Sequence, residues 1–329
     1  MLVTLTNSAA APRLRAWLVR EGLASRVVQA GRALLIQDPF VPPAVRQILE
    51  RDPEVDAVEV TTALPDRVLK RGDEEAPPVP GLERMPLIAG PCAVESRDLA
   101  FETARFLKEI GVAWMRGGTD KTRTSLHSFQ GHGLQAAEWL REAADAHGLR
   151  VVSELTEGPG AEGIAELLDM IQVGARHMHN PRHLQRLGRL GKPVVLKRGL
   201  AASPEEWLWA AEYLLEAGAP TVLFCERGVR TASPLKRFTL DLGAVPFIRA
   251  MTPFPILVDP SHAAGASPYV APLARAAMAA GAHGVVVECH PDPAEALSDG
   301  LQALDFPALA RLAAELGAAT VVTEKAGAR

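Results

Sequence analysis

The side chains in this 329-residue sequence that could do chemistry recur just after short apolar runs. In chain order they are Cys92, Arg116, Lys121, Arg123, Glu154, Arg176, Lys197, Glu226, Arg227, Asp259, His262, Glu288 and Asp299. Six of them are cations, although 35 basic and 39 acidic residues give the chain a net charge of −4. Guanidinium groups bind oxyanions in a bidentate manner, and lysine adds a point charge. The pattern therefore predicts a site for a strongly anionic substrate.

A second pattern suggests a metal site, because one thiol, one imidazole and two carboxylates occur among these residues: Cys92, His262, Glu288 and Asp299. This mixed set suits borderline divalent ions such as Mn, Fe, Co or Zn better than Mg or Ca. The spacing alone leaves an alternative open. A single cysteine is usually a small buried hydrophobe, and a histidine here could simply cap a helix. By strand alternation, the other two cysteines, Cys225 and Cys289, are expected in the core.

The apolar runs before these residues read as eight short strands, each followed by a polar turn and an amphipathic helix. The expected strands are residues 86–89, 112–116, 150–154, 170–173, 193–197, 221–224, 256–259 and 284–288. Eight such units match the (β/α)₈ barrel, which typically needs ~250 residues. Its active site forms at the carboxyl ends of the strands, and its first, seventh and eighth units become neighbours when the barrel closes. Closure would therefore allow the four candidate ligands to meet.

The chain before residue 85 has a different organisation. Residues 1–72 read as βαββαβ, the order of a ferredoxin-like domain, with a turn at Ala30-Gly31 between the two middle strands. Residues 73–84 are charged and rich in proline, and we interpret them as a linker. The expected architecture is an α/β chain with a small N-terminal domain, a linker and a (β/α)₈ barrel over residues 85–329.

Composition excludes several classes of function. There is no basic tract, so nucleic acid is not an expected partner. No uncharged stretch reaches the ~18 residues of a membrane span, and no secretory signal precedes the first strand. Three cysteines are too few for a disulfide framework, which favours a reducing compartment. We expect a soluble cytoplasmic protein.

Over nearly its whole length, the chain closely resembles the type Iβ 3-deoxy-D-arabino-heptulosonate 7-phosphate synthases. The resemblance rests on a series of motifs in family order: Ile88-Ala89-Gly90-Pro91-Cys92, Arg116-Gly117-Gly118, Ser128-Phe129-Gln130-Gly131, Gly174-Ala175-Arg176, Lys197-Arg198-Gly199, Glu226-Arg227-Gly228, Asp259-Pro260-Ser261-His262 and Ser298-Asp299-Gly300. It implies condensation of phosphoenolpyruvate with erythrose 4-phosphate and water, the first step of the shikimate pathway. It also implies one divalent metal held by Cys92, His262, Glu288 and Asp299.

The resemblance further sorts the polar residues by role. It implies that phosphoenolpyruvate lies among five cations: Arg116, Lys121, Arg176, Lys197 and Arg227. The segment Lys121-Thr122-Arg123-Thr124-Ser125 would hold erythrose 4-phosphate, and Asp259 would lie in the same substrate site. We expect Lys121, Glu154 and His262 to take part in catalysis. For the N-terminal domain, the resemblance implies feedback inhibition by tyrosine or phenylalanine, with a structural or oligomerising role left open, and for the whole protein it implies a homotetramer.

Three alternatives to this reaction remain open. Asp120 precedes Lys121 where the family has an aromatic residue, a feature shared with the related 3-deoxy-D-manno-octulosonate 8-phosphate synthases, which use arabinose 5-phosphate. Lys197 ends a barrel strand and could instead form a Schiff base. Finally, the chain could be a non-catalytic amino-acid sensor. The intact set of polar residues favours the synthase.

Overall fold

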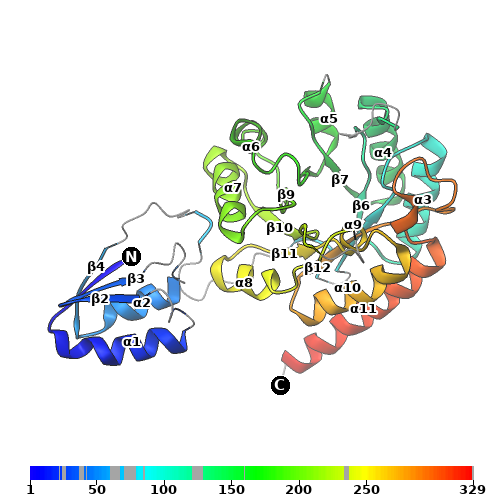
Figure 1. Ribbon diagram of the computed structural model, residues 1–329. Helices are drawn as coiled ribbons and strands as arrows, with labels where there is room; N and C mark the ends of the chain where they lie inside the picture. The colour runs from blue at the N-terminus through cyan, green and yellow to red at the C-terminus, as the bar shows by residue number, and fades with distance from the viewer. Residues whose placement is uncertain are drawn as a thin grey trace. The chain divides into compact units, whose positions relative to one another are not determined.

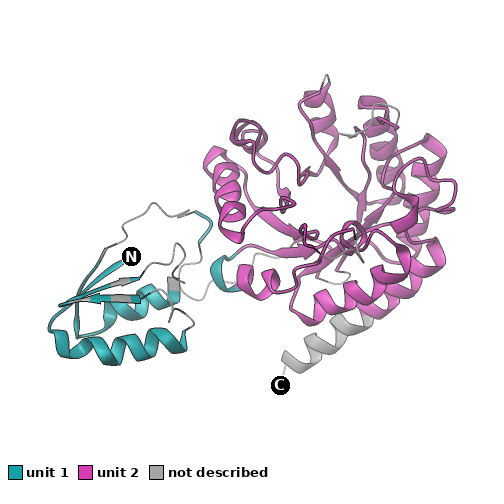
Figure 2. Cartoon of the chain, viewed as in Figure 1, with its two compact units in different colours: residues 1–75, 250–253 teal, residues 76–249, 254–329 magenta. Residues whose placement is uncertain are grey.

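The computed structural model describes residues 1–21, 23, 27–36, 41, 43–59, 67–69, 79–83, 86–120, 129–158, 160–232 and 237–327. It forms two compact units, shown in teal and magenta in Figure 2. One unit comprises Met1–Glu75 with Ala250–Pro253, and the other comprises Ala76–Arg249 with Phe254–Arg329. None of the described helices combines the length and the apolar run that crossing a membrane requires.

The first unit contains a four-stranded sheet in the order β2-β3-β1-β4. Its strands are β1 (Leu2–Leu5), β2 (Val27–Ala30), β3 (Ala33–Ile36) and β4 (Val55–Glu59), and each pairs antiparallel with its neighbours. The helical elements are η1 (Ser8–Ala10), α1 (Ala11–Arg20) and α2 (Pro43–Arg51). Gly31 supplies the positive φ, +58°, in the turn between β2 and β3. The unit has the expected βαββαβ order, with the small antiparallel sheet packed around its own apolar core.

The second unit is a closed barrel of eight parallel strands. The strands are β5 (Leu87–Gly90), β6 (Trp114–Arg116), β7 (Arg150–Glu154), β8 (Met170–Val173), β9 (Val194–Lys197), β10 (Val222–Glu226), β11 (Ile256–Val258) and β12 (Gly284–Glu288). β12 pairs with β5, so the first, seventh and eighth strands are neighbours. The predicted (β/α)₈ fold is confirmed.

Helices surround this barrel, as Figure 1 shows. They are α3 (Arg97–Glu109), α4 (Leu134–His147), α5 (Ala161–Leu167), α6 (Pro181–Gly188), α7 (Pro204–Ala217), α8 (Ala244–Met251), α9 (Pro260–Ala264), α10 (Val270–Ala279) and α11 (Phe306–Gly327), with η3 (Ser267–Tyr269) and η4 (Gly300–Gln302). Local sequence fixes the ends of α7: Ser203 and Glu206 form a capping box, and Gly218 ends the helix with φ of +118°.

The barrel interior is filled by apolar side chains, to which every strand contributes. They are Ile88, Trp114, Val152, Met170, Val195, Leu223, Cys225, Leu257 and Val286. Residues 79–83, within the predicted linker, contact this core: Leu82 belongs to it, and the Trp114 indole donates to the Pro80 carbonyl over 2.8 Å. Cys225 and Cys289 are both fully buried, which confirms their assignment to the core.

Candidate active site

The candidate residues lie at the carboxyl ends of the barrel strands, because each strand exposes its last inward side chain there. Arg116, Glu154, Lys197 and Glu288 end β6, β7, β9 and β12. Cys92, Arg227 and Asp259 come within two residues after β5, β10 and β11. The parallel barrel therefore gathers residues far apart in sequence at one end.

Three of the four predicted metal ligands form a compact cluster. Ligand atoms of Cys92, Glu288 and Asp299 all lie within 4.8 Å of one another. Cys92 Sγ is 3.3 Å from Asp299 Oδ2 and 2.9 Å from Ser298 Oγ. A thiol and two carboxylates this close form a donor set suited to a borderline divalent ion.

Asp299 adopts an unusual backbone conformation that brings it into this cluster. Its φ is +54°, and among the described residues no other non-glycine residue has a positive φ. The left-handed region costs an ordinary residue free energy, and strained residues of this kind concentrate at functional sites. Gly300 follows it, and a side chain at 300 would collide with the Pro293 carbonyl. The loop is thus shaped to direct the Asp299 carboxylate toward Cys92.

His262 lies at the edge of the cluster, next to Glu288. Its Nε2 is 3.4 Å from Glu288 Oε1, while its Nδ1 is 2.7 Å from Asp259 Oδ2. Burial lowers the pKa of His262, with Asp259 and Glu288 opposing the shift, so a neutral imidazole is favoured near neutral pH. A neutral ring held by a carboxylate at Nδ1 leaves Nε2 to bind a metal. Asp259 also accepts a bond from the His262 backbone amide and is itself the N-cap of α9, so the alternative that His262 caps this helix is wrong.

Three of the predicted cations are almost fully buried in the same region: Arg116, Lys197 and Arg227. Arg116 donates to the Pro91 carbonyl over 2.6 Å and approaches Glu288 Oε1 at 3.2 Å. Lys197 Nζ is 2.6 Å from Asp259 Oδ2. Burial acts to raise the pKa of Asp259, but His262 and Lys197 outweigh it and hold that pKa well below its usual range. Buried charges need such partners.

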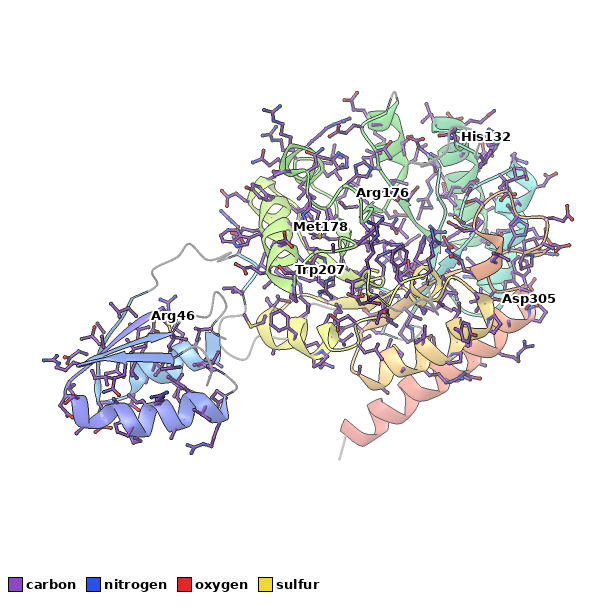
Figure 3. The ribbon with its side chains drawn as sticks, in the orientation of Figure 1. Arg46, His132, Arg176, Met178, Trp207 and Asp305 are labelled. Carbon is purple, nitrogen blue, oxygen red and sulfur yellow. The ribbon has the colours of Figure 1, made fainter. Side chains whose placement is uncertain are left out.

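The other predicted site residues are less closely tied to the cluster. Glu154 is half-buried, and its carboxylate packs where a side chain at Gly174 would stand. Arg176, labelled in Figure 3, is exposed after β8 and makes no ion pair with residues that the structure describes. Lys121, Arg123, Thr124 and Ser125 lie outside the described residues. Just before them, Asp120 accepts a hydrogen bond from Thr156 Oγ1 over 2.5 Å.

The structure adds three residues that the sequence did not single out individually: Ser298, Gln302 and Arg237. Gln302 Nε2 donates to Glu288 Oε2 over 2.6 Å, and its Oε1 accepts from Arg237 over 2.7 Å. Arg237 also reaches Asp299 Oδ1 at 3.4 Å. They are partners of the candidate ligands rather than ligands. The Ser298-Asp299-Gly300 motif was the only signal that pointed to this loop.

Glu226 faces the opposite way from the cluster, although its position at a strand end placed it among the candidate residues. Strand alternation explains this, because Cys225 faces the barrel core and its neighbour Glu226 must face outward. The Glu226 carboxylate contacts Arg198 Nη1 at 3.0 Å instead.

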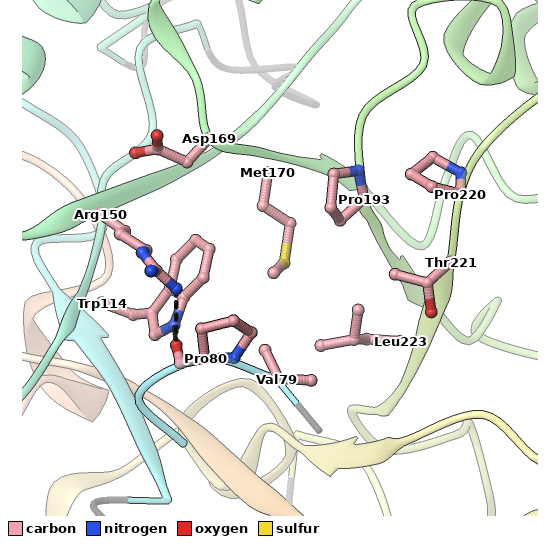
Figure 4. A pocket seen from close by; sticks show the side chains of 10 residues that line it. All are labelled: Val79, Pro80, Trp114, Arg150, Asp169, Met170, Pro193, Pro220, Thr221 and Leu223. Carbon is pink, nitrogen blue, oxygen red and sulfur yellow. Dashed lines mark hydrogen bonds between the residues drawn. The ribbon is translucent and has the colours of Figure 1, made fainter. Parts of the chain in front are cut away.

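A cavity of about 390 Å³ lies at the other end of the barrel (Figure 4). It is lined mainly by apolar residues at the amino ends of β6 to β10, including Met170 and Leu223. Its charged residues already have protein partners. Arg150 donates to the Pro80 carbonyl, and Asp169 accepts from Arg141 and from the Val151 amide. None of the predicted site residues lines this cavity.

The barrel and the cluster of thiol, carboxylates and buried cations at its carboxyl end together define a class, the barrel enzymes that act on anionic substrates. Comparison with known families narrows this class. Residues 81–324 match the model of the DAHP synthetase I family, and the chain belongs to that family.

Individual relatives agree with this assignment. The chain is 50% identical over 230 residues to phospho-2-dehydro-3-deoxyheptonate aldolase of Thermotoga maritima, covering 70% of this chain and 68% of the relative. A crystal structure of that name from the same organism matches with a TM-score of 0.77 and 38% identity, over 98% of this chain and 97% of the other. A 2-dehydro-3-deoxyphosphooctonate aldolase of Nitratidesulfovibrio vulgaris is 34% identical over 70% of this chain and 90% of its own.

Proposed function

We infer that this chain condenses phosphoenolpyruvate with erythrose 4-phosphate and water, giving 3-deoxy-D-arabino-heptulosonate 7-phosphate and phosphate. This reaction opens the shikimate pathway. The observation that carries the inference is the cluster of Cys92, Glu288 and Asp299 beside buried cations. The relatives also favour erythrose 4-phosphate over arabinose 5-phosphate as the aldose, because the chain is 50% identical to a heptulosonate enzyme and 34% identical to an octulosonate enzyme.

We propose that Cys92, His262, Glu288 and Asp299 hold one divalent ion of the Mn, Fe, Co or Zn group. A metal ion bound there would act as a Lewis acid toward the aldehyde oxygen of the aldose. Arg116 and Gln302 hold the Glu288 carboxylate from two sides, and Asp259 orients His262. These contacts would preorganise the donor atoms for the ion.

The buried cations would bind phosphoenolpyruvate. Arg116, Lys197 and Arg227 supply positive charge in a dry site, where it attracts the phosphate and carboxylate far more strongly than in water. Lys121 and Arg176 complete the proposed phosphoenolpyruvate site, and Asp259 fixes Lys197 within it. Holding two polyanions together against their repulsion is the main task of such a site.

Erythrose 4-phosphate would bind to Lys121, Arg123, Thr124 and Ser125. The Asp120 carboxylate beside that segment accepts a hydrogen bond from Thr156 Oγ1. For the acid and base steps we propose Lys121, Glu154 and His262. Glu154 stands at the end of β7 and is accessible enough to exchange a proton with bound substrate or water.

The remaining proposals concern the whole protein. Residues 1–72 would form a regulatory domain that binds tyrosine or phenylalanine as inhibitor, joined through a linker over residues 73–84 to the catalytic barrel over 85–329. The support is the βαββαβ order of the first unit. We further propose a cytoplasmic homotetramer, to be tested by light scattering and by inhibition assays with the two amino acids.

The test of the activity is a phosphate-release assay with phosphoenolpyruvate and either aldose phosphate. We expect turnover with erythrose 4-phosphate, and a much lower kcat/KM with arabinose 5-phosphate. Higher kcat/KM with arabinose 5-phosphate would favour the octulosonate reaction. No turnover with either aldose in the presence of Mn, Fe, Co and Zn would favour the sensor.

A further inference from the structure

A second cluster of buried charges lies on the outer face of β9 and β10, and the proposed chemistry does not use it. Arg198 and Glu226 are at most 5% exposed. Arg198 Nη1 is 3.0 Å from Glu226 Oε2 and 2.8 Å from Asp241 Oδ2. Arg198 also donates through Nε to the Ala202 carbonyl and lies over the Trp207 ring. Burying the charges of Arg198 and Glu226 is costly, and the partly exposed Asp241 adds a second carboxylate to the pair.

Two residues of this cluster are sequence neighbours of two proposed phosphoenolpyruvate-binding residues. Arg198 follows Lys197 at the end of β9, and Glu226 precedes Arg227 at the end of β10. Lys197 contacts Asp259 on the inner side, and Arg227 interacts electrostatically with the same carboxylate. Each strand end therefore carries one cation toward the site and one member of an ion pair away from it. The inner charges repel each other, whereas the outer charges attract and join the same two strands.

Glu226 also fixes the backbone around Arg227. Its Oε1 accepts from the Gly228 amide over 2.7 Å and from the Asp241 amide over 3.4 Å. The first bond closes a turn around Arg227, and the second holds residues 237–241, the returning segment, in place. One carboxylate thus links β9, β10 and that segment.

The returning segment supports the Arg227 side chain directly. The Arg227 guanidinium lies 4.3 Å from the centre of the Phe238 ring. Val229 and Thr239 exchange backbone bonds of 2.9 Å, which keeps Phe238 alongside. Gly228 has φ of +91°, and a side chain there would collide with Phe238. The position of Arg227 therefore depends on residues that themselves depend on Glu226.

We propose that Arg198, Glu226 and Asp241 are positioning residues that hold Arg227 and Lys197 at the separation needed to bind phosphoenolpyruvate. This rests on the proposed function, because it assigns those two cations to that substrate. Arg198, Glu226 and Asp241 themselves touch no substrate. Their loss should weaken binding of phosphoenolpyruvate more than it slows the chemical step.

The principal test is Glu226→Gln, which keeps the shape of the side chain and removes its charge. Steady-state kinetics should show KM for phosphoenolpyruvate raised between ~10-fold and ~100-fold, the range expected from displacing a binding group by a fraction of an ångström to about 1 Å. The kcat and the KM for erythrose 4-phosphate should change much less. Calorimetry with phosphoenolpyruvate alone should show the same loss of affinity.

Asp241→Asn provides a milder variant, because Asp241 is partly exposed and the Arg198–Glu226 pair remains. We expect a smaller rise in the same KM, and this variant carries the test if Glu226→Gln does not fold. The matched control is Asp169→Asn, which breaks the Arg141–Asp169 pair of 2.7 Å at the amino end of the barrel. It should lower the melting temperature and leave KM unchanged.

These measurements distinguish failure of the proposed function from failure of the positioning role alone. An inactive wild-type chain would contradict the proposed function itself. An active wild type together with a folded Glu226→Gln or Asp241→Asn variant whose KM for phosphoenolpyruvate is unchanged would overturn the positioning role alone. A fall in the kcat of either variant, with no change in its KM for phosphoenolpyruvate, would also overturn the positioning role.

Discussion

The two ends of the barrel are built from the same strands but differ in how they treat charge. At the carboxyl end, Arg116, Lys197, Asp259 and Glu288 are buried, each at most 4% exposed. At the amino end, Arg150 and Asp169 are exposed around an apolar cavity. Buried charge is costly and exposed charge is not, so the carboxyl end has kept an unfavourable arrangement. The carboxyl end therefore serves chemistry, whereas the amino end serves stability.

The largest expected effect comes from removing a thiol at the carboxyl end. Cys92→Ala should reduce metal affinity by more than the ~10-fold to ~100-fold that loss of an outer partner gives, because it removes a proposed ligand itself. Activity should fall in parallel. Metal content by mass spectrometry and kcat measure the two effects.

The matched control is Cys289→Ala, since burial raises the pKa of the Cys289 thiol to about 12 and keeps it protonated. This variant should retain its metal. Equal metal content in the Cys92 and Cys289 variants would remove the distinction between an active-site thiol and a core thiol.

An intermediate effect, on stability rather than on activity, is expected at the amino end. Leu223 is fully buried in the barrel core and lines the cavity. Leu223→Ala should cost about 2–5 kcal/mol of unfolding free energy, because it removes buried methyl groups and enlarges a void. Denaturant titration measures this loss. A large fall in kcat without a loss of stability would show that the amino end also takes part in the chemistry.

Much of this difference between the two ends of the barrel could be predicted from the sequence. Each barrel strand is a short apolar run bounded by turns, so the strands were found to within about two residues, and barrel closure brought Cys92 near Glu288 and Asp299. The outward direction of Glu226 was also within reach, because alternation from the buried Cys225 requires it.

Other features depend on tertiary structure and left little local signal. Asp299 has a left-handed backbone, and the next residue, Gly300, packs against the Pro293 carbonyl. The bond from Gln302 to Glu288 requires the loop after β12 to fold back over the strand end. Neither contact has a periodicity or a spacing that a sequence could display. The roles of Lys121, Arg123, Thr124 and Ser125 stay predictions.

The smallest effect concerns a partly exposed ion pair in the first unit, which provides a reference for the buried charges of the barrel. Arg13 Nη2 is 2.7 Å from Asp52 Oδ1, and the bond from Arg13 lowers the pKa of Asp52. A carboxyl whose pKa is lowered by folding stabilises the protein above its unfolded pKa of ~3.9. That stabilisation is lost as the pH falls through the lower, folded value.

Asp52→Asn should therefore lower the melting temperature slightly at neutral pH. Solvent screens the pair, so the difference stays small. Thermal scans of both proteins from pH 7 downward should converge in acid. A difference that stays constant to the lowest pH would mean that the charge of Asp52 contributes nothing.

Removal of the metal tests whether the carboxyl end of the barrel holds a catalytic ion. The chain is treated with EDTA, desalted, and assayed for phosphate release from phosphoenolpyruvate and erythrose 4-phosphate before and after addition of Mn. We predict loss of activity on chelation and recovery with Mn. Full activity in the metal-free chain, or borohydride trapping of substrate on Lys197, would rule out a metal-dependent reaction.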